Sequence, residues 1–310
     1  MTLPRLQLSV IGDEIGPSLD EMISFAHEHS LKHLDMRTVG GRNLLSMSLD
    51  EVIQISRTLE KAGIDVPAFV SPAFKWRAPG KFVSSRKVDF AFDPAQCAVE
   101  DWVAHAMQIT VILGAPHMRI FSYLRYGRFA PFDIYNLNDH LRRLLGLAGH
   151  YDVSLQLENE PVCNIGNIAD LADFFRAVEK AADEEVVDEE EQFDKRDKDR
   201  PEPIHLRPLV DIANAWATGE RPSDADIGFL APLTTAIHLK DRVLAEGRTV
   251  PLGDGDIPWA AELKRLLSGV AEKEVLATIE THVPQDGRNA TARSIAGFRR
   301  IAAEIGAEII

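Results

Sequence analysis

The feature that most constrains the fold is a repeated alternation of short apolar segments with longer amphipathic segments. The short segments are typical of buried strands and the longer ones of helices with one apolar face. This order predicts a parallel sheet covered by helices. The predicted strands cover residues 6–11, 33–37, 66–71, 117–121, 153–158, 207–211, 234–238 and 275–280. The predicted helices cover residues 18–29, 48–62, 94–113, 134–149, 168–182, 258–267 and 291–305.

Eight strands favour closure of the sheet into a (β/α)₈ TIM barrel. Such a barrel typically needs about 250 residues, so the 310 residues of this chain suffice for one. We therefore expect a single TIM-barrel domain over residues 1–310. An open, doubly wound sheet is the alternative fold. Its usual Gly-rich dinucleotide fingerprint is absent after the first strand, where the sequence reads Gly12-Asp13-Glu14-Ile15-Gly16.

The formal net charge of −14 argues against a nucleic-acid partner, because phosphate binding needs a positive surface. Half of this charge is local: residues 183–202 contain eleven acidic and four basic side chains. We interpret residues 183–205 as an exposed or mobile acidic insert between the fifth helix and the sixth strand. In a barrel this places the insert on the face opposite the active site.

The sequence also carries expectations about location and partners. No apolar run approaches the roughly 20 residues of a membrane helix, and residues 1–10 lack the pattern of a secretory signal. We therefore expect a cytoplasmic protein that contacts no membrane and acts on a small molecule. A homo-oligomer remains open.

Ionisable side chains end four successive predicted strands. Glu158 shares one strand face with polar residues, while Val153 and Leu155 share the other, so Glu158 is expected to point into the barrel. Asp211, His238 and Glu280 are placed in the same way at the ends of the next three strands. The carboxyl ends of barrel strands converge on one mouth, so these four side chains are expected to meet there.

Three carboxylates in one place would repel one another, and burial would raise their pKa values. A bound cation resolves this conflict. Oxygen-rich ligands with one imidazole suit Mn²⁺ or Mg²⁺ best, with Co²⁺ or Zn²⁺ as alternatives. We therefore predict one divalent metal ion as the cofactor.

The chain resembles the xylose isomerase-like barrels, a family that includes sugar isomerases, ketose epimerases, inosose dehydratases and metal-dependent AP endonucleases. The resemblance covers nearly the whole chain. It rests on short motifs at successive strand ends: Leu157-Glu158-Asn159-Glu160-Pro161, Val210-Asp211-Ile212-Ala213-Asn214, Ile237-His238-Leu239-Lys240-Asp241, the glycine loop of residues 251–259, and Ile279-Glu280. It implies that Glu158, Asp211, His238 and Glu280 are the four protein ligands of one metal ion.

Two departures from the family pattern narrow the expected activity. Asn214 stands where several members carry histidine, and Gly247-Arg248-Thr249 stands where AP endonucleases need an Asp-x-His. A site for three zinc ions therefore cannot be built, which argues against DNA repair. Glu160 is a third departure, because relatives often have histidine there. We regard it as a neighbour of the metal ligands.

The predicted activity is that of an isomerase or epimerase acting on a sugar or sugar phosphate. Such an enzyme removes a proton beside a carbonyl and passes through a metal-stabilised enediolate. Glu158 and Glu280 are the candidate catalytic residues, each as ligand and acid or base in one. Asp211 and His238 are expected to be mainly ligands. The candidate substrate contacts are Arg37, Lys75, Arg119, Glu160, Asn214 and Arg242.

Two other functions stay open. A dehydratase acting on a keto-polyol or a hydroxy-keto acid, such as an inosose or dehydroshikimate, would need the same metal and the same proton abstraction. A barrel that binds a metabolite without catalysis is the second alternative. The four ionisable groups disfavour it, because an idle site does not need them around one point.

Overall fold

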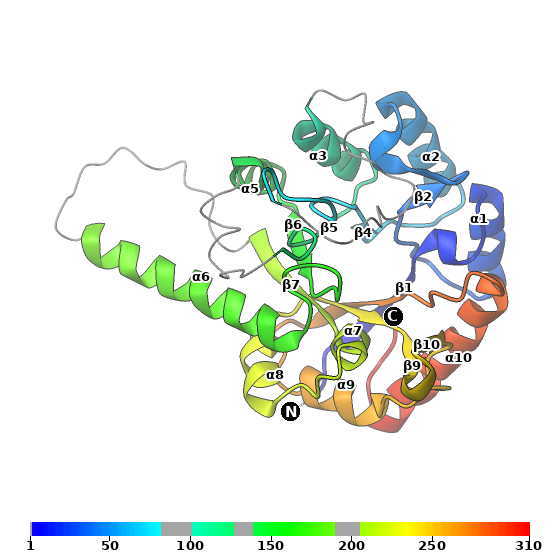
Figure 1. The fold of residues 1–310 in the computed structure, drawn as a ribbon. Coiled ribbons are helices and arrows are strands. Elements are labelled where there is room, and N and C mark those ends of the chain that lie inside the picture. The colour runs from blue at the N-terminus through cyan, green and yellow to red at the C-terminus, as the bar shows by residue number, and fades with distance from the viewer. Residues whose placement is uncertain (1, 82–100, 127–138, 190–204) are drawn as a thin grey trace.

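The computed structural model describes residues 2–81, 101–126, 139–189 and 205–310 (Figure 1). Its main element is a seven-stranded sheet in the order β1-β11-β8-β7-β6-β5-β4, in which every neighbouring pair is parallel. The strands are β1 (Arg5–Val10), β4 (Ala68–Phe69), β5 (His117–Ile120), β6 (Ser154–Glu158), β7 (Leu206–Asp211), β8 (Ala236–Leu239) and β11 (Glu274–Ile279).

The predicted strand at residues 33–37 is present as isolated bridges that join the two ends of this sheet. Asp35 exchanges backbone hydrogen bonds with the β1 side, through Val10 O and Gly12 N at 2.9 Å each. Met36 does the same with the β4 side, donating to Ala68 O at 3.1 Å and accepting from Val70 N at 2.9 Å. The curled sheet is therefore closed through residues 35 and 36, as a TIM barrel requires.

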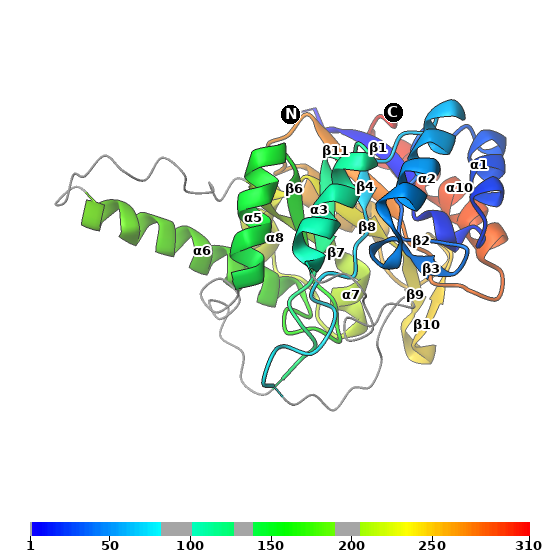
Figure 2. The same cartoon turned by 90° about the horizontal axis from the view of Figure 1, so that it is seen from above.

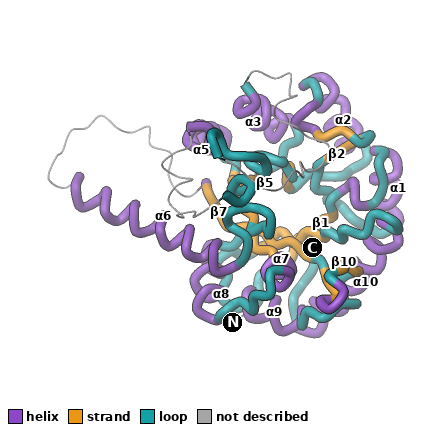
Figure 3. The backbone as a smooth tube through the Cα atoms, viewed as in Figure 1, coloured by secondary structure: helices purple, strands orange, loops and turns teal. Residues whose placement is uncertain are grey.

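Helices surround this sheet (Figures 1 and 3). They are α1 (Leu19–Glu28), α2 (Leu49–Lys61), α3 (Trp102–Ile112), α5 (Asp139–Tyr151), α6 (Ile168–Glu189), α7 (Ile212–Ala217), α8 (Asp224–Leu230), α9 (Trp259–Leu267) and α10 (Gly287–Ile305). Both α1 and α2 begin with a complete capping box, Ser18 with Glu21 and Ser48 with Glu51. The sequence did not predict α7 and α8. No described helix is long and apolar enough to span a membrane.

Part of the predicted acidic insert lies outside the described residues. Residues 183–189 continue α6, which is longer than predicted and projects away from the barrel (Figure 1). Residues 190–204 lie outside the described part, as do the predicted helix starts at 94 and 134.

Apolar side chains fill two separate regions. The larger core lies between the sheet and its helices. A small second cluster, formed by Ala68, Leu209, Ala236 and Leu276, consists of residues on the inner face of four strands. Leu209 precedes Asp211 by two positions, and Ala236 precedes His238 by two positions. Because strand side chains alternate between faces, this apolar cluster lies inside the barrel next to Asp211 and His238.

Short connections lie at the carboxyl ends of the strands. They include the hairpins β2 (Thr38–Val39) with β3 (Arg42–Asn43) and β9 (Asp241–Val243) with β10 (Arg248–Val250). They also include the 3-10 helices η1 (Gly12–Glu14), η2 (Leu44–Ser46) and η6 (Leu244–Glu246), while η5 (Ala231–Leu233) precedes β8. In Figure 2 the β9–β10 hairpin lies at the opposite end of the barrel from the C-terminus.

Candidate metal centre

Four side chains from neighbouring strands converge at the carboxyl end of the barrel. Glu158 and Asp211 are the last residues of β6 and β7, His238 lies in β8, and Glu280 follows β11 directly. One potential ligand atom from each lies within 4.8 Å of the others, and each residue is 2% exposed or less. The structure therefore brings together all four residues that the sequence predicted as ligands.

Asp211 is fixed by the start of a helix. It is the N-cap of α7, and its Oδ1 accepts a hydrogen bond from Asn214 N at 2.8 Å. The side chain of Asn159 pairs with its backbone, accepting from Asp211 N at 2.9 Å and donating to Asp211 O at 2.8 Å. Only Oδ2 of Asp211 is left to face the other three side chains.

Two arginines hold the glutamates in place. Arg119 Nη1 lies 3.1 Å from Glu158 Oε2 and 3.6 Å from Glu280 Oε1, so one guanidinium bridges β6 and β11. Arg37 Nη1 lies 3.3 Å from the same Glu280 oxygen. Both guanidiniums are almost fully buried. Each glutamate is thereby tied by one oxygen and turns the other toward the centre of the group.

Lys240 adds a buried ammonium to this group. Its Nζ lies 2.5 Å from Asp211 Oδ2 and 2.7 Å from Glu280 Oε2. It follows His238 by two positions in the chain, so it shares the inward side of β8. The sequence interpretation missed Lys240, although the same alternation that selected His238 also selects it.

The charged neighbours set the pKa values of the site. Burial alone would lower the pKa of His238, but the carboxylates of Glu158 and Glu280 outweigh burial and raise it to about 9. Burial raises the pKa of Glu158, yet His238 and Arg119 together hold it below its ordinary value. Burial also raises the pKa of Asp211, which the ammonium of Lys240 opposes. The charged neighbours of Glu158 and Asp211 thus favour the ionised carboxylates that binding of a cation requires.

Two observations show that these residues fit a divalent metal ion. His238 Nδ1 is buried 3.3 Å from Glu158 Oε1 and 3.5 Å from Glu280 Oε2, yet it forms a well-aligned hydrogen bond with no described group. Buried nitrogens normally have a partner. The second observation is the charge balance of the ion-paired network, which joins five carboxylates to three permanent cations. Its members are Asp13, Glu14, Glu158, Asp211, Glu280, Arg37, Arg119 and Lys240. An imidazole that binds a metal ion must be neutral, and with His238 in this form a charge of +2 balances the network.

A second carboxylate and histidine group adjoins the first. Glu14, Glu280 and His282 offer atoms within 4.8 Å of one another. Arg37 lies between two of them, with Nη2 2.9 Å from Glu14 Oε1 and Nη1 3.3 Å from Glu280 Oε1. Since the Arg37 guanidinium already stands between these carboxylates, we interpret the group as one that orients Glu280 rather than as a second ion site.

The structure brings most of the predicted substrate contacts to this mouth. Arg37 and Arg119 bind the glutamates, as described above, and Asn214 Nδ2 lies 3.4 Å from Glu158 Oε1. Lys75 and Glu160 form a largely buried pair at 2.8 Å. Arg37 and Arg119 are therefore engaged with the candidate ligands, and Lys75 and Glu160 are engaged with each other.

Arg242 is placed differently from the other candidates. It lies in the β9–β10 hairpin, where its guanidinium donates to Gly247 O at 2.9 Å. The sequence could not show this, because the hairpin that turns the side chain away was not predicted. The structure does not bring Arg242 to the four candidate ligands.

The glycine loop is held by a residue that the sequence did not single out. Asp241 Oδ2 accepts hydrogen bonds from the backbone N–H groups of Gly253 at 3.0 Å and Gly255 at 3.2 Å. A Cβ on Gly255 would lie 2.2 Å from Asp241 Oδ1. The missing side chain of Gly255 therefore allows the loop to approach Asp241, next to Lys240.

Strained backbone also marks the mouth. Phe74, Tyr123 and His282 have positive φ angles of 65°, 60° and 51°, and they follow β4, β5 and β11. Non-glycine residues in this region cost about 1 to 3 kcal/mol and collect at functional sites. Phe74 and Tyr123 also pack against each other, with ring centroids 5.2 Å apart.

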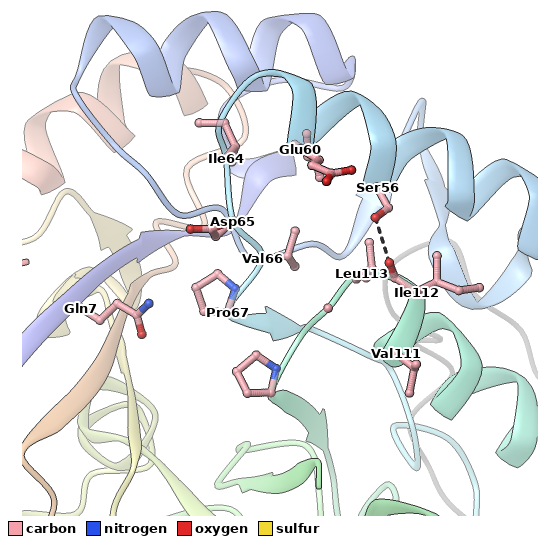
Figure 4. Close-up of a pocket in the computed structure, with 13 residues that line it drawn as sticks. Gln7, Ser56, Glu60, Ile64, Asp65, Val66, Pro67, Val111, Ile112 and Leu113 are labelled. Atoms are coloured by element: carbon pink, nitrogen blue, oxygen red, sulfur yellow. Dashed lines mark hydrogen bonds between the residues drawn. The ribbon is translucent and has the colours of Figure 1, made fainter. Parts of the chain in front are cut away.

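A separate hollow of about 490 Å³ lies at the other end of the barrel. Its lining includes Ser56 and Glu60 of α2, residues 64–67 before β4 and residues 111–114 around the end of α3 (Figure 4). Ser56 Oγ donates to Ile112 O at 2.8 Å across one side. None of the four candidate ligands lines this hollow, so we do not assign it to the site.

A closed parallel barrel whose carboxyl end gathers Glu158, Asp211, His238 and Glu280 defines the class: a TIM barrel with a candidate metal site. No protein-family model matches the sequence, and no curated protein matches it. Solved structures do match, and several of them are named xylose isomerase domain or xylose isomerase-like TIM barrel proteins. The fold of this chain is the fold of that group.

Three of the matched structures illustrate the range of this fold. The IolI protein with a bound zinc atom has a TM-score of 0.67 at 14% identity, with 96% of this chain and 99% of that chain covered. The 3-keto-D-glucoside 4-epimerase YcjR from E. coli has 0.58 at 13%, covering 94% and 99%. The probable 3-DHS dehydratase AsbF from Bacillus anthracis has 0.59 at 14%, covering 94% and 98%. At these identities the comparison concerns the fold alone.

Proposed function

We propose that this protein is a metal-dependent isomerase or epimerase of an uncharged sugar, which moves a proton beside a carbonyl group. The observation that carries this proposal is the buried Nδ1 of His238, without a hydrogen bond to any described group, among three carboxylates that converge on one point. The proposed ligands are Glu158, Asp211, His238 and Glu280. The epimerase among the matched folds supports the proposed class.

The ligand set suits a hard divalent cation, with Mn²⁺ or Mg²⁺ preferred over Zn²⁺ or Co²⁺ because three of its four donors are oxygens. When bound, such an ion would stabilise negative charge that develops on neighbouring substrate oxygens. A zinc-containing and a magnesium-containing protein are both among the matched folds.

Glu158 and Glu280 are the proposed acid and base groups. They come from β6 and β11, on either side of β7 and β8, so they approach the centre of the mouth from different directions. Arg119 contacts both carboxylates and thereby fixes their separation. His282 Nε2 lies 3.2 Å from Glu280 Oε1, and its ring is one-third exposed, which offers a route for a proton between Glu280 and solvent.

The charge balance favours a sugar over a sugar phosphate. Three of the candidate substrate contacts are cations, Arg37, Lys75 and Arg119, and they are already paired with carboxylates. With one divalent cation bound, the described network is neutral, so a phosphate dianion would enter without a compensating charge. Hydroxyl groups are better matched to these fixed donors and acceptors.

Dehydration is the second candidate, because a probable 3-DHS dehydratase has the same fold. Loss of a β-hydroxyl would follow the same proton abstraction by Glu158 or Glu280. A screen of keto sugars, inososes and dehydroshikimate-like acids separates the two reactions by their products. An epimer or ketose supports the first, and an alkene or aromatic product supports the second.

The assigned roles are tested by exchange of the substrate proton with deuterated solvent. We expect Glu158→Gln, Glu280→Gln or both to lose exchange by at least about 100-fold. Glu246→Gln, a surface carboxylate paired with Arg248, is the matched control and should retain it. Unchanged exchange in both site variants would refute the assignment.

The cofactor is tested independently. Protein purified without chelator is analysed for bound metal, and thermal stability is measured on adding Mn²⁺ or Mg²⁺. Absence of bound metal together with no stabilisation would favour a metabolite-binding barrel without catalysis.

A further inference from the structure

Lys240 is buried at the centre of the candidate metal centre. It is 1% exposed, and its ammonium lies within 2.7 Å of two carboxylate oxygens from different strands. Burial alone would lower the pKa of this lysine, but Asp211 and Glu280 raise it well above its ordinary value. The two carboxylates in contact with the ammonium therefore offset the cost of burying its charge.

The oxygens that Lys240 binds are those that a metal ion would need. Asp211 Oδ1 is used by Asn214 N, which leaves Oδ2, and Oδ2 is bound by Lys240. Glu280 Oε1 is contacted by Arg37 and Arg119, which leaves Oε2, and Oε2 is bound by Lys240 as well.

The unsatisfied imidazole nitrogen points to the same place. His238 Nδ1 lies 3.5 Å from Glu280 Oε2, the oxygen that Lys240 holds at 2.7 Å. A metal ion that takes Nδ1 and Oε2 together would stand close to the ammonium. Two cations at such separation in a buried site repel strongly, so both cannot keep the same two oxygens.

We propose that Lys240 is an internal counter-ion that competes with the metal ion for Asp211 and Glu280, so that metal uptake is an exchange in which the ammonium leaves these oxygens. This inference rests on the metal site of the proposed function. Without metal, Lys240 relieves repulsion between buried carboxylates and keeps the barrel mouth folded. The cost of displacing it weakens metal binding and keeps the bound ion exchangeable.

The test compares Lys240→Met with the wild-type protein after removal of metal by a chelator. Thermal unfolding is measured with and without Mn²⁺, and Mn²⁺ affinity is measured by calorimetry. Without metal, we expect Lys240→Met to melt roughly 5 to 10 °C lower, because it leaves buried carboxylates without their partner. With Mn²⁺, we expect a larger stabilisation than in the wild type and a Kd lower by on the order of 100-fold.

Lys75→Met is the matched control. Lys75 is also a largely buried lysine in an ion pair, but its partner is Glu160 rather than a proposed ligand. Its loss should lower stability without changing the Mn²⁺-induced shift. A Mn²⁺ affinity of Lys240→Met equal to or weaker than that of the wild type would overturn the inference while leaving the proposed function intact.

Other outcomes also decide the question. Recovery of folded Lys240→Met only in the presence of Mn²⁺ supports the inference. If this variant does not fold under either condition, it is replaced by Lys240→Gln, which keeps a hydrogen-bond donor without the charge. We expect Lys240→Gln to bind Mn²⁺ more tightly than the wild type. Unchanged binding would refute the exchange. If neither the wild type nor the variants respond to Mn²⁺, the metal site and the lysine role both fail.

Discussion

Asp35 should make the stability of the barrel depend on pH. It is fully buried where residues 35 and 36 close the sheet, and its carboxylate accepts hydrogen bonds from Ser9 Oγ at 2.8 Å and Thr278 Oγ1 at 2.6 Å. No cation is among its described hydrogen-bond partners. Burial raises the pKa of Asp35 from 3.8 to about 6, although the two hydroxyl groups oppose this.

The direction of the effect follows from this raised pKa. The folded chain binds the proton more tightly than the unfolded chain, so protonated Asp35 stabilises the fold fully below about pH 4. This stabilisation is lost as the pH rises through about 6. A difference of about 2 pH units corresponds to about 3 kcal/mol.

Asp35→Asn removes the titration while keeping a similar shape and the ability to bond both hydroxyls. Relative to the wild type, the variant should therefore gain about 3 kcal/mol of unfolding free energy between pH 4 and pH 7.5. Urea unfolding of metal-free protein at several pH values in this range measures the difference. Titrating groups that do not interact with Asp35 contribute equally to both proteins and cancel, whereas His238, which lowers the pKa of Asp35, does not cancel in full.

Asp65→Asn is the control. Asp65 is the bridge partner of His33 and lies close to the segment that closes the sheet, but it is exposed. Its substitution should change stability by a similar small amount at each pH. A stability difference between Asp35→Asn and the wild type that stays constant within about 0.5 kcal/mol across this pH range would refute the assignment of Asp35 as a buried, destabilising charge.

Further predictions concern the fold and the metal. Ser48→Ala removes the cap and capping box of α2 and should lower the unfolding free energy by about 1 kcal/mol, measured by denaturant titration. Gly297→Ala should destabilise by about 1 to 3 kcal/mol, because its Cβ would lie 1.9 Å from Leu252 O. Gly146→Ala, on an open face of α5, should instead stabilise by about 0.5 to 1 kcal/mol, and equal effects of the two would contradict this argument. Removal of metal from the wild type with a chelator should abolish activity, and adding Mn²⁺ should restore it. Full activity in the presence of chelator would exclude a catalytic ion.

Much of the fold was predictable from the alternation of short apolar segments with longer amphipathic segments in the sequence. Seven of the eight predicted strands appear as strands, each within two residues at its carboxyl end. The eighth, at 33–37, forms only isolated bridges, through His33, Asp35 and Met36, a local irregularity that apolar alternation cannot reveal. The helices α7 and α8 were missed because each is only about two turns long, too short to show a helical period.

The candidate site was predictable where the position of a residue along a strand decides which way its side chain points. Glu158, Asp211, His238 and Glu280 were found because each ends a strand with its side chain inward. The sequence did not reveal that Asp13 and Glu14 reach Arg37. These contacts depend on how a 3-10 turn after β1 folds against the closing segment, which no periodic pattern encodes.

The two guanidiniums and the proposed ligands come from different halves of the chain. Arg37 and Arg119 belong to the first half, whereas Glu158 and Glu280 belong to the second. A substitution at one of these positions leaves a buried charge in the other half without its partner. Among relatives, positions 37 and 280 should therefore change together, as should 119 and 158. A homologue that has lost the arginine at 119 but kept all three acids would have to supply another cation at the mouth.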